Sequence, residues 1–312
     1  MQSVSPTTGT LRARLPLPAL LRAMRPKQYL KNGIVFTALV FSVRQAWRPA
    51  YPDTWLPLLL RALVAFLAFC AIASAEYLVN DIRDREADRR HPRKCLRPIA
   101  SGELPVGVAQ SAAVALFAAG LLIGVALGWR FLGVLAGYAA LMLAYSYILK
   151  GLVLVDVLVI AIGFVLRAIA GAIAIGVPIS PWLYLCTLLG ALFLAVNKRR
   201  HELVMLQNGA GHHRRILEEY STHLLDQLSA MVTAATLIAY SLYTFSAENL
   251  PKNHVMMITI PFVIYGLFRY LYLVYQKDEG GSPDEIVVRD RPLLLCMGLW
   301  IVTAGILLAL FR

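Results

Sequence analysis

The sequence predicts an all-α polytopic membrane protein, and three observations lead to this fold class. Hydrophobic residues make up 59% of the 312 residues, well above the roughly 45–50% that is typical of soluble domains, and the mean hydropathy is +0.64. The apolar residues gather in runs that approach or exceed the length of about 20 residues needed to cross a bilayer. Polar segments rich in Lys and Arg separate these runs.

Residues 1–24 are expected to form an N-terminal tail, and residues 25–312 a single transmembrane domain. The first ten residues are polar. Residues 11–24, LRARLPLPALLRAM, mix leucine with arginine, a composition typical of a short helix that lies in the membrane interface. We therefore expect an interfacial helix before the first span.

Nine apolar runs predict nine membrane-spanning helices. The first is short for a span, so we expect its start to extend toward Pro26. Gly120, Gly124 and Gly128 recur every four residues in the third run, which predicts the close approach of a neighbouring helix. The expected spans are 29–43, 54–79, 105–127, 131–149, 152–175, 181–197, 223–246, 254–275 and 292–311.

Nine spans place the two termini on opposite sides of the membrane, and the distribution of basic residues predicts the orientation. Most of the 30 Lys and Arg residues lie on the N-terminal side. Because cytoplasmic loops carry the excess of Lys and Arg, the N-terminus and all long polar loops are expected in the cytoplasm. The basic residues on the other side are Arg44, Arg48, Arg130, Lys252 and Arg312.

The second span ends in the richest cluster of charge, residues 74–102. Asp81, Asp84 and Asp88 fall within roughly 60° of one face of a helix, and Asn80 lies at its edge. Three carboxylates on one face repel each other unless a cation lies among them. Hard oxygen ligands suit Mg²⁺, which proteins bind through one or two carboxylates together with substrate phosphates. The pattern predicts a magnesium site formed by these four residues.

A basic segment follows these carboxylates directly and could hold phosphate anions. A solvated charged loop is the alternative for any such run. The carboxylate spacing, the preceding apolar helix and the basic tail occur together here, which favours a metal and diphosphate site. The basic residues are Arg83, Arg85, Arg89, Arg90, Arg93, Lys94 and Arg97.

A second charged segment follows the sixth span and carries Lys198, Arg199, Arg200 and Glu202. It lies four spans after the first, so the two halves could be a diverged internal duplication. A basic loop that only sets the topology is the alternative. That alternative explains the sign of the charge, but it does not explain Glu202 and the compact Lys-Arg-Arg sequence at a helix end.

Ionisable residues within spans are costly and are therefore candidates for a site. Arg167 lies deep in the fifth span, and its partner could be an acidic side chain or a bound anion. Asp156 begins the same span, near Tyr145 and Lys150. Arg269 could reach the interface along its own side chain. The loop 276–292 contains two glycines and could be a mobile lid or an ordinary solvated loop.

The net charge of +12 raises the question of nucleic-acid binding. The sequence contains no basic motif with interleaved aromatic residues, so no nucleic-acid partner is expected. Anionic membrane lipid and anionic substrates explain the charge better. The four cysteines and six histidines show no metal-ligand spacing.

These motifs resemble the UbiA-type intramembrane prenyltransferases. The resemblance is carried by Asn80-Asp81-x-x-Asp84-x-x-x-Asp88 after the second span and by Tyr145-Ser146 followed by Lys150. It is closer still to the branch that acts on decaprenyl phosphate and phosphoribosyl diphosphate. The segments similar to that branch are 25–32, 77–92, 97–102, 166–172, 198–203 and 288–291.

The resemblance implies a UbiA-type bundle of nine helices with the active site facing the cytoplasm of the plasma (inner) membrane. The sequence departs from the ordinary pattern of this family at 198–202, where prenyltransferases carry a second Asp-rich motif that holds a second magnesium. Lys198, Arg199 and Arg200 instead favour direct binding of a phosphate. This substitution suits a phosphorylated sugar and a lipid monophosphate as substrates.

The implied reaction is Mg²⁺-dependent transfer of 5-phosphoribose from 5-phosphoribosyl diphosphate to a polyprenyl phosphate, with release of diphosphate, for arabinan or a related glycan of the cell wall. Lys198, Arg199 and Arg200 are expected on the 5-phosphate. The other expected substrate-binding residues are Lys27, Lys31, Arg83, Tyr145, Lys150, Arg167 and Glu202.

Two other functions are weighed against this one: prenyl transfer to a small acceptor, and transport of lipid or solute. The missing second Asp-rich motif argues against prenyl transfer. Transporters place their binding residues near the bilayer midplane, whereas the charge here gathers on one face. The sequence leaves open the lipid chain length, the downstream glycan and the formation of a homo-oligomer.

Overall fold

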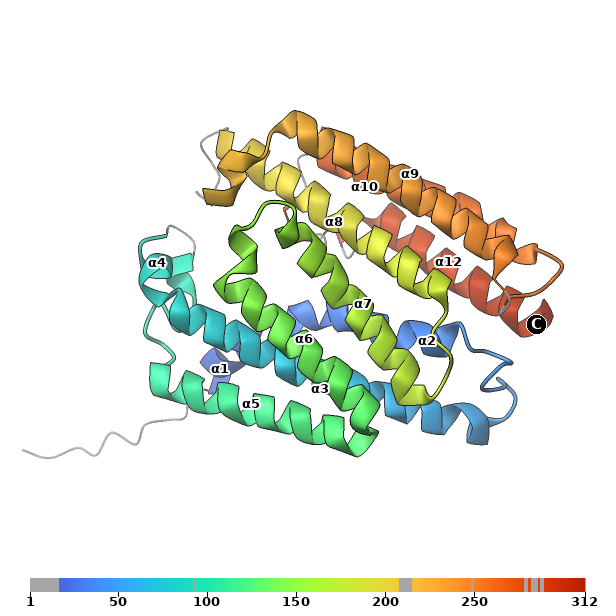
Figure 1. Ribbon diagram of the computed structural model, residues 1–312, viewed down its shortest axis with the longest axis horizontal. Helices are drawn as coiled ribbons and strands as arrows, with labels where there is room; N and C mark the ends of the chain where they lie inside the picture. Colours follow the sequence, from blue (N-terminus) through green and yellow to red (C-terminus); the bar gives the residue numbers. More distant parts are fainter. Residues whose placement is uncertain are drawn as a thin grey trace, which may run out of the picture.

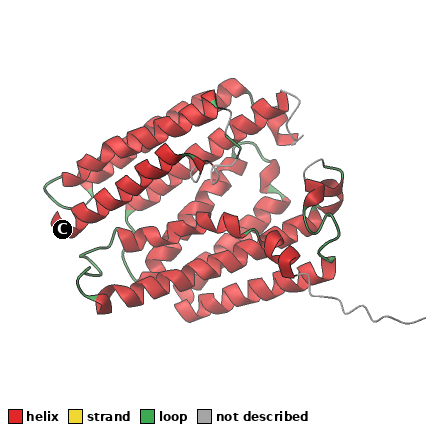
Figure 2. Ribbon diagram, turned by 180° about the vertical axis from the view of Figure 1, so that it is seen from behind, coloured by secondary structure: helices red, strands yellow, loops and turns green. Residues whose placement is uncertain are grey.

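The computed structural model describes residues 17–91, 94–207, 215–247, 250–277, 280–281, 286 and 289–311. Within these residues the chain is helical, and its only β-type pairing is an isolated bridge between Val43 and Trp47. Figures 1 and 2 show a bundle of long helices joined by short connections. The described part of the chain therefore has the all-α fold that the sequence predicts.

Among the described residues, eight helices have the length and apolar composition needed to cross a membrane. They confirm eight of the expected spans, and the one expected at 254–275 begins with η5 (Val255–Thr259), which runs directly into α10. Their bounds are α3 (Pro52–Arg83), α5 (Val106–Leu127), α6 (Trp129–Tyr147), α7 (Val155–Ile175), α8 (Pro181–Gln207), α9 (Thr222–Ser246), α10 (Ile260–Gln276) and α12 (Arg291–Phe311).

The expected first span, 29–43, has a different form, because its residues 29–36 belong to the 11-residue 3₁₀-helix η1 (Pro26–Phe36), which is followed by the 4-residue α2 (Thr37–Val40). A 3₁₀-helix rises about 2.0 Å per residue and an α-helix about 1.5 Å. Together the two elements extend about 28 Å, close to the roughly 30 Å of a bilayer core. The geometry supports a ninth crossing, which stays a prediction.

Contacts with α3 show how far this first segment reaches. Tyr29 Oη lies 2.8 Å from Ser74 Oγ near the end of α3 that carries the aspartates. Farther along, Phe36 packs on Phe66 with ring centroids 5.6 Å apart. The segment thus runs antiparallel to α3, and its end joins a buried cluster that contains Ala62.

In Figure 1, α3, α5 and α6 form one side of the bundle and α8, α9, α10 and α12 the other, with α7 and α2 between them. The largest buried cluster lies among α3, α6, α7 and η1 and includes Phe69, Ile72, Tyr138 and Ala170. The short helix α4 (Arg85–Arg89) continues α3 at one end of the bundle, and the C-terminus lies at the other.

The residues expected to form an interfacial helix include α1 (Leu17–Met24). Ala19 and Ala23 of α1 are buried in a cluster with Leu78 of α3, while Leu17 and Leu21 are exposed. Arg22 also forms an ion pair with Glu103. The helix therefore packs on the aspartate-bearing end of α3. Residues 11–16 of the prediction lie outside the described residues.

Close helix packing is confirmed at two of the three glycines in α5. A Cβ on Gly120 would lie 2.8 Å from Cδ1 of Ile72, and one on Gly124 would lie 3.0 Å from a side-chain carbon of Leu132. The prediction is wrong for Gly128, which ends α5 with φ 106° and has open space around it. Its role is the tight turn between α5 and α6, where a left-handed backbone favours glycine.

Gly171 of α7 makes a closer approach that the sequence spacing did not predict. A Cβ at this position would lie 2.1 Å from the carbonyl oxygen of Val35. The backbone of η1 therefore rests directly on α7, which brings the polar residues of η1 into contact with those of α7.

Candidate active site

The predicted metal-binding residues lie where α3 ends and α4 begins. Asn80 and Asp81 belong to the last turn of α3, Asp84 joins the two helices, and Asp88 lies in α4. The backbone continues the helical direction, since the Asp84 N–H donates to the Asn80 carbonyl at 2.9 Å and the Asp88 N–H donates to the Asp84 carbonyl at 2.8 Å. Asp81 and Asp88 are buried.

Two arginines fill the space around these buried carboxylates. Arg97 Nη1 donates to Asp81 Oδ1 at 3.0 Å and to Asp88 Oδ2 at 2.6 Å. Arg25 Nη2 donates to the same Asp81 oxygen at 2.6 Å. Two of the three predicted carboxylates, Asp81 and Asp88, therefore converge, and the Arg97 guanidinium lies between them.

Asp84 points to a different partner, at the connection between α6 and α7. Lys150, in the short η3 (Leu149–Gly151), places its Nζ 3.8 Å from Asp84 Oδ2. Arg83 donates to the carbonyl of Ser146 and lies over the Tyr147 ring, 4.4 Å from its centroid. Arg83 of α3 and Lys150 of η3, both predicted to bind substrate, thus lie beside Asp84.

Among the described residues, no three His, Cys, Asp or Glu side chains stand close enough to hold a metal ion together. The donor set nevertheless fits Mg²⁺ in two respects. Its ligands are hard carboxylate oxygens, and Asp81 and Asp88 already converge on one cationic atom. These residues are therefore the best-suited metal ligands that the described part of the chain offers.

A second polar cluster surrounds Arg199 of α8. Its side chain is 2% exposed, and Nε donates to Asp156 Oδ2 at 2.6 Å, where the Asp156 side chain is 0% exposed. Nη1 pairs with Glu202, and Nη2 donates to Tyr145 Oη at 3.4 Å. The structure thus brings Tyr145, Arg199 and Glu202 together. The Arg199 guanidinium, however, is already ion-paired with the carboxylates of Asp156 and Glu202.

Tyr220, just before α9, completes this cluster. Its hydroxyl donates to Asp156 Oδ1 at 2.8 Å and accepts a hydrogen bond from the Leu154 N–H at 2.7 Å. Burial raises the pKa of Tyr220 to about 12, so the hydroxyl keeps its proton and remains a donor at neutral pH. Both oxygens of Asp156 are therefore satisfied.

Arg200 faces a separate group at the start of α9 and the end of α10. Its Nε donates to Asp226, and its guanidinium lies 3.8 Å from the centroid of the Tyr275 ring. Tyr275 Oη also donates to Asp226 Oδ1, at 2.8 Å. Lys198 is partly exposed, as is Arg200.

Arg167 lies in a buried polar network inside the bundle. It donates to Asn32 Oδ1 at 2.8 Å, to the Gly163 carbonyl at 3.0 Å and to Tyr138 Oη at 2.6 Å. Glu76 interacts electrostatically with both Arg167 and Tyr138, and its Oε1 is buried without a hydrogen-bond partner among the described residues. The partners of Arg167 in the structure are thus the Asn32 and Tyr138 side chains and the Gly163 carbonyl.

The remaining predicted cations lie on η1. Lys27 is exposed, and Lys31 donates to Gln28. Both follow Arg25, which contacts Asp81, so this start of η1 presents positive charge next to the aspartates.

The loop 276–292 is described only in part, and Asp284 and Glu285 lie outside the described residues. Asp290 accepts from Arg269 Nη2 at 2.8 Å and from the Leu293 N–H at 2.8 Å. The Arg269 guanidinium holds the pKa of Asp290 below its usual value. The Gly280 N–H donates to His201 Nδ1 at 3.1 Å, which attaches the loop to α8.

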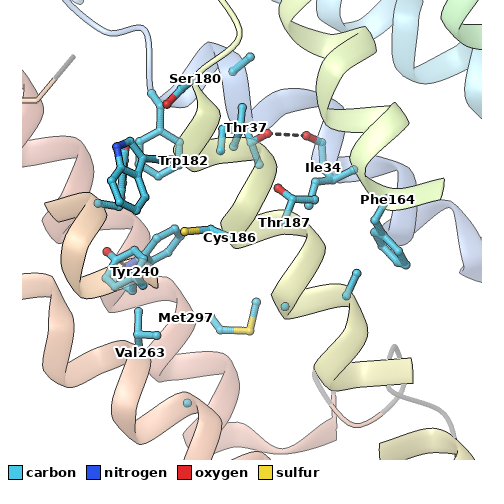
Figure 3. A pocket seen from close by; sticks show the side chains of 18 of the residues that line it. Ile34, Thr37, Phe164, Ser180, Trp182, Cys186, Thr187, Tyr240, Val263 and Met297 are labelled. Carbon is cyan, nitrogen blue, oxygen red and sulfur yellow. Dashed lines mark hydrogen bonds between the residues drawn. The ribbon is translucent and has the colours of Figure 1, made fainter. Parts of the chain in front are cut away.

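An apolar cavity of about 460 Å³ lies among η1, α2, α7, α8, α9, α10 and α12. Figure 3 shows Trp182, Cys186 and Tyr240 on one side of it, with Phe164 and Met297 among the other lining side chains. One wall contains the hydrogen bond from Thr37 Oγ1 to the Ile34 carbonyl, at 2.7 Å. The lining of the cavity is mostly apolar, which suits hydrocarbon better than a polar ligand.

Sequence reasoning missed the roles of several residues in these clusters. Arg25 and Arg97 were visible as members of basic segments, but their pairing with the aspartates depends on tertiary contacts. Tyr220 and Tyr138 were not singled out. Glu76 carried a usable signal, because it is an acidic residue within a span, one turn before Asn80.

Fold and site together define a polytopic helical membrane protein with buried carboxylates and basic side chains clustered at one end of the bundle. The family model described as "UbiA prenyltransferase family" matches residues 34–284. The chain belongs to this family.

Several relatives that are similar over nearly the whole chain share one name. The chain is 35% identical to the decaprenyl-phosphate phosphoribosyltransferase of Mycolicibacterium smegmatis, over 97% of this chain and 96% of that protein. It is also 35% identical to the protein of the same name from Mycobacterium tuberculosis, over 92% and 93%. A solved UbiA homolog from Archaeoglobus fulgidus, bound to GPP and Mg²⁺, has the same fold, with a TM-score of 0.69 and 19% identity over 94% of this chain and 100% of that one.

Proposed function

We propose that the protein transfers 5-phosphoribose from 5-phosphoribosyl diphosphate to a polyprenyl phosphate of the decaprenyl type and releases diphosphate. The observation that carries this proposal is the similarity, over nearly the whole chain, to proteins named decaprenyl-phosphate phosphoribosyltransferase. The product would serve the synthesis of cell-wall arabinan or a related glycan.

Asp81, Asp84 and Asp88, with Asn80, would hold Mg²⁺, as supported by the bound Mg²⁺ of the A. fulgidus homolog. When bound, the metal supplies Lewis-acid stabilisation of the charge that develops on the diphosphate oxygens.

Basic side chains of this protein would offset the rest of the negative charge on the diphosphate. Lys150 and Arg83 lie beside Asp84 and are placed to neutralise the leaving group as the C1–O bond breaks. Lys27 and Lys31 present further charge from η1. The sugar becomes oxocarbenium-like, as in glycoside cleavage.

The attacking atom would be an oxygen of the lipid phosphate, which is ionised at neutral pH. The reaction therefore requires no protein base, and the task of the enzyme is to position two anions and offset their charge. Lys198 and Arg200, both partly exposed, would contribute to the 5-phosphate, Arg200 in exchange for its contact with Asp226. Arg199 and Arg167, whose guanidinium groups are satisfied by protein partners, are better assigned to holding the site in shape.

The polyprenyl chain would lie in the apolar cavity among η1, α2 and the C-terminal helices. The orientation predicted by the positive charge puts the aspartates at the cytoplasmic face of the plasma membrane. In that arrangement a water-soluble sugar donor reaches the site from the cytoplasm, while the lipid acceptor reaches it from the bilayer.

The test supplies purified protein with phosphoribosyl diphosphate and decaprenyl phosphate and identifies the lipid product by mass spectrometry. The proposal expects a lipid heavier by one phosphoribosyl group. A parallel reaction with geranyl diphosphate and aromatic acceptors tests prenyl transfer, and a prenylated acceptor as sole product would overturn the proposal. Asp84→Asn serves as the inactive variant, and Asp53→Asn, at the exposed opposite end of α3, is its matched control.

A further inference from the structure

The position of Arg97 relative to the aspartates carries an inference beyond the reaction itself. One atom, Nη1, donates to Asp81 Oδ1 at 3.0 Å and to Asp88 Oδ2 at 2.6 Å. The side chains of these aspartates are 2% and 4% exposed, while that of Arg97 is 27% exposed. A solvent-accessible cation therefore bridges two buried carboxylates.

The backbone of Arg97 is fixed while its side chain is long and flexible. Its N–H donates to the Lys94 carbonyl at 2.9 Å, and its carbonyl accepts from the Ser101 N–H at 2.8 Å. The next residues, Ile99 and Ala100, are buried. The guanidinium can therefore leave the carboxylates by rotation of side-chain bonds, without movement of the loop.

A guanidinium and a divalent cation compete for this place. Mg²⁺ binds carboxylate oxygens at about 2.0–2.1 Å, so an ion that uses Asp81 Oδ1 and Asp88 Oδ2 would occupy the volume of Nη1. The two cations also repel each other. Without either, Asp81 would keep Arg25, but Asp88 would be left buried with no ion-pair partner among the described residues, which is costly.

We propose that Arg97 is an exchangeable internal cation of the metal site. It neutralises Asp81 and Asp88 before substrate binds and leaves them when the metal and diphosphate enter. The released guanidinium then lies next to the diphosphate and donates to its oxygens, a geometry for which arginine is well suited. The diphosphate step rests on the proposed function, whereas the competition with the metal rests only on the observed contacts.

The test measures Mn²⁺ binding to the purified protein by electron paramagnetic resonance, without substrate. Removal of a competitor tightens metal binding, so Arg97→Gln is expected to bind Mn²⁺ about tenfold more tightly than the unmodified chain. A merely structural role predicts the opposite, because a distorted site binds metal more weakly. Unchanged or weaker binding in Arg97→Gln overturns the proposal.

A matched control is Arg22→Gln, which removes a nearby arginine that pairs with Glu103 and not with the aspartates. Its Mn²⁺ affinity is expected to stay unchanged. If Arg97→Gln does not fold, Arg97→Lys replaces it. Lysine is a shorter point charge that cannot bridge both oxygens in the same way, so Mn²⁺ binding tighter than in the unmodified chain is again expected, and equal or weaker binding contradicts the proposal.

A second measurement follows the fate of the released guanidinium. With Mn²⁺ present, Arg97→Gln is expected to bind inorganic diphosphate several-fold more weakly than the unmodified chain, despite its tighter metal. Equal diphosphate affinity refutes the second half of the proposal. Lipid product formation by the unmodified chain is scored separately, so failure of the proposed reaction and failure of the Arg97 exchange are distinguishable.

Discussion

Neutralisation of Asp156 should destabilise the protein through Arg199. In Asp156→Asn the buried guanidinium loses its fully buried carboxylate partner, 2.6 Å away, and keeps Glu202 and the longer contact to Tyr145. Removing one partner of a buried ion pair typically costs about 3–5 kcal/mol, because a charge is left buried without compensation. Since Glu202 remains as a partner, we expect about 3 kcal/mol, the lower end of this range.

The same structure predicts how the two residues combine. Arg199→Met alone leaves Asp156 buried with Tyr220 as its one remaining side-chain donor among the described residues, so it should also destabilise the chain. In Asp156→Asn/Arg199→Met neither charge remains, and the loss should be smaller than the sum of the single losses by about 1–3 kcal/mol, the coupling found for residues in contact.

Unfolding of the detergent-solubilised protein, followed by tryptophan fluorescence, measures these free energies. Asp53→Asn changes an exposed aspartate of α3 and is expected to stay within about 0.5 kcal/mol of the unmodified chain. If the single variants match this control, or if their losses simply add in the double variant, the buried pair does not stabilise the protein as reasoned here.

Two further predictions concern stability. Gly171→Ala places a methyl group 2.1 Å from the Val35 carbonyl oxygen, so it should lower the thermal midpoint by several degrees. Its control is Gly133→Ala in α6, which has open space around it and should leave the midpoint unchanged or raise it. Equal midpoints for the two variants would contradict the close approach of η1 to α7. The pKa of Asp290 is lowered by Arg269, so its contribution to stability is complete above the usual aspartate pKa of about 3.9 and is lost as the pH falls through the lowered value. Thermal midpoints between pH 5 and pH 3 should therefore fall less steeply in Asp290→Asn, and an unchanged slope would rule out this linkage.

The sequence was sufficient for most of the fold because apolar length and turn residues are local signals. The bounds of α5 match the expected span within one residue. The end of α8 was placed at 197, ten residues early, because the charged residues 198–202 looked like a loop. In the structure Arg199 finds its carboxylate partners in Asp156 and Glu202, which allows the helix to continue through them.

The candidate site was predicted in its residues but only partly in its contacts. The spacing of Asp81 and Asp88 was enough to place them together, because helical periodicity is a property of the local chain. Which cation lies between them was not predictable, since Arg25 and Arg97 reach Asp81 from segments 56 and 16 residues away in the sequence. Pattern also could not show that Gly171 allows η1 to rest on α7.

The central claim is that the aspartates at the end of α3 bind the metal ion that promotes the departure of diphosphate. The most direct measurement is the rate of diphosphate release from phosphoribosyl diphosphate, with decaprenyl phosphate present, by the unmodified chain and by Asp81→Asn/Asp84→Asn at saturating Mg²⁺. Loss of several kcal/mol of charge stabilisation predicts a fall of at least about a hundredfold in the double variant, and abolished release by the unmodified chain in chelator. Turnover by the double variant at the unmodified rate, or release that persists in chelator, would contradict the account.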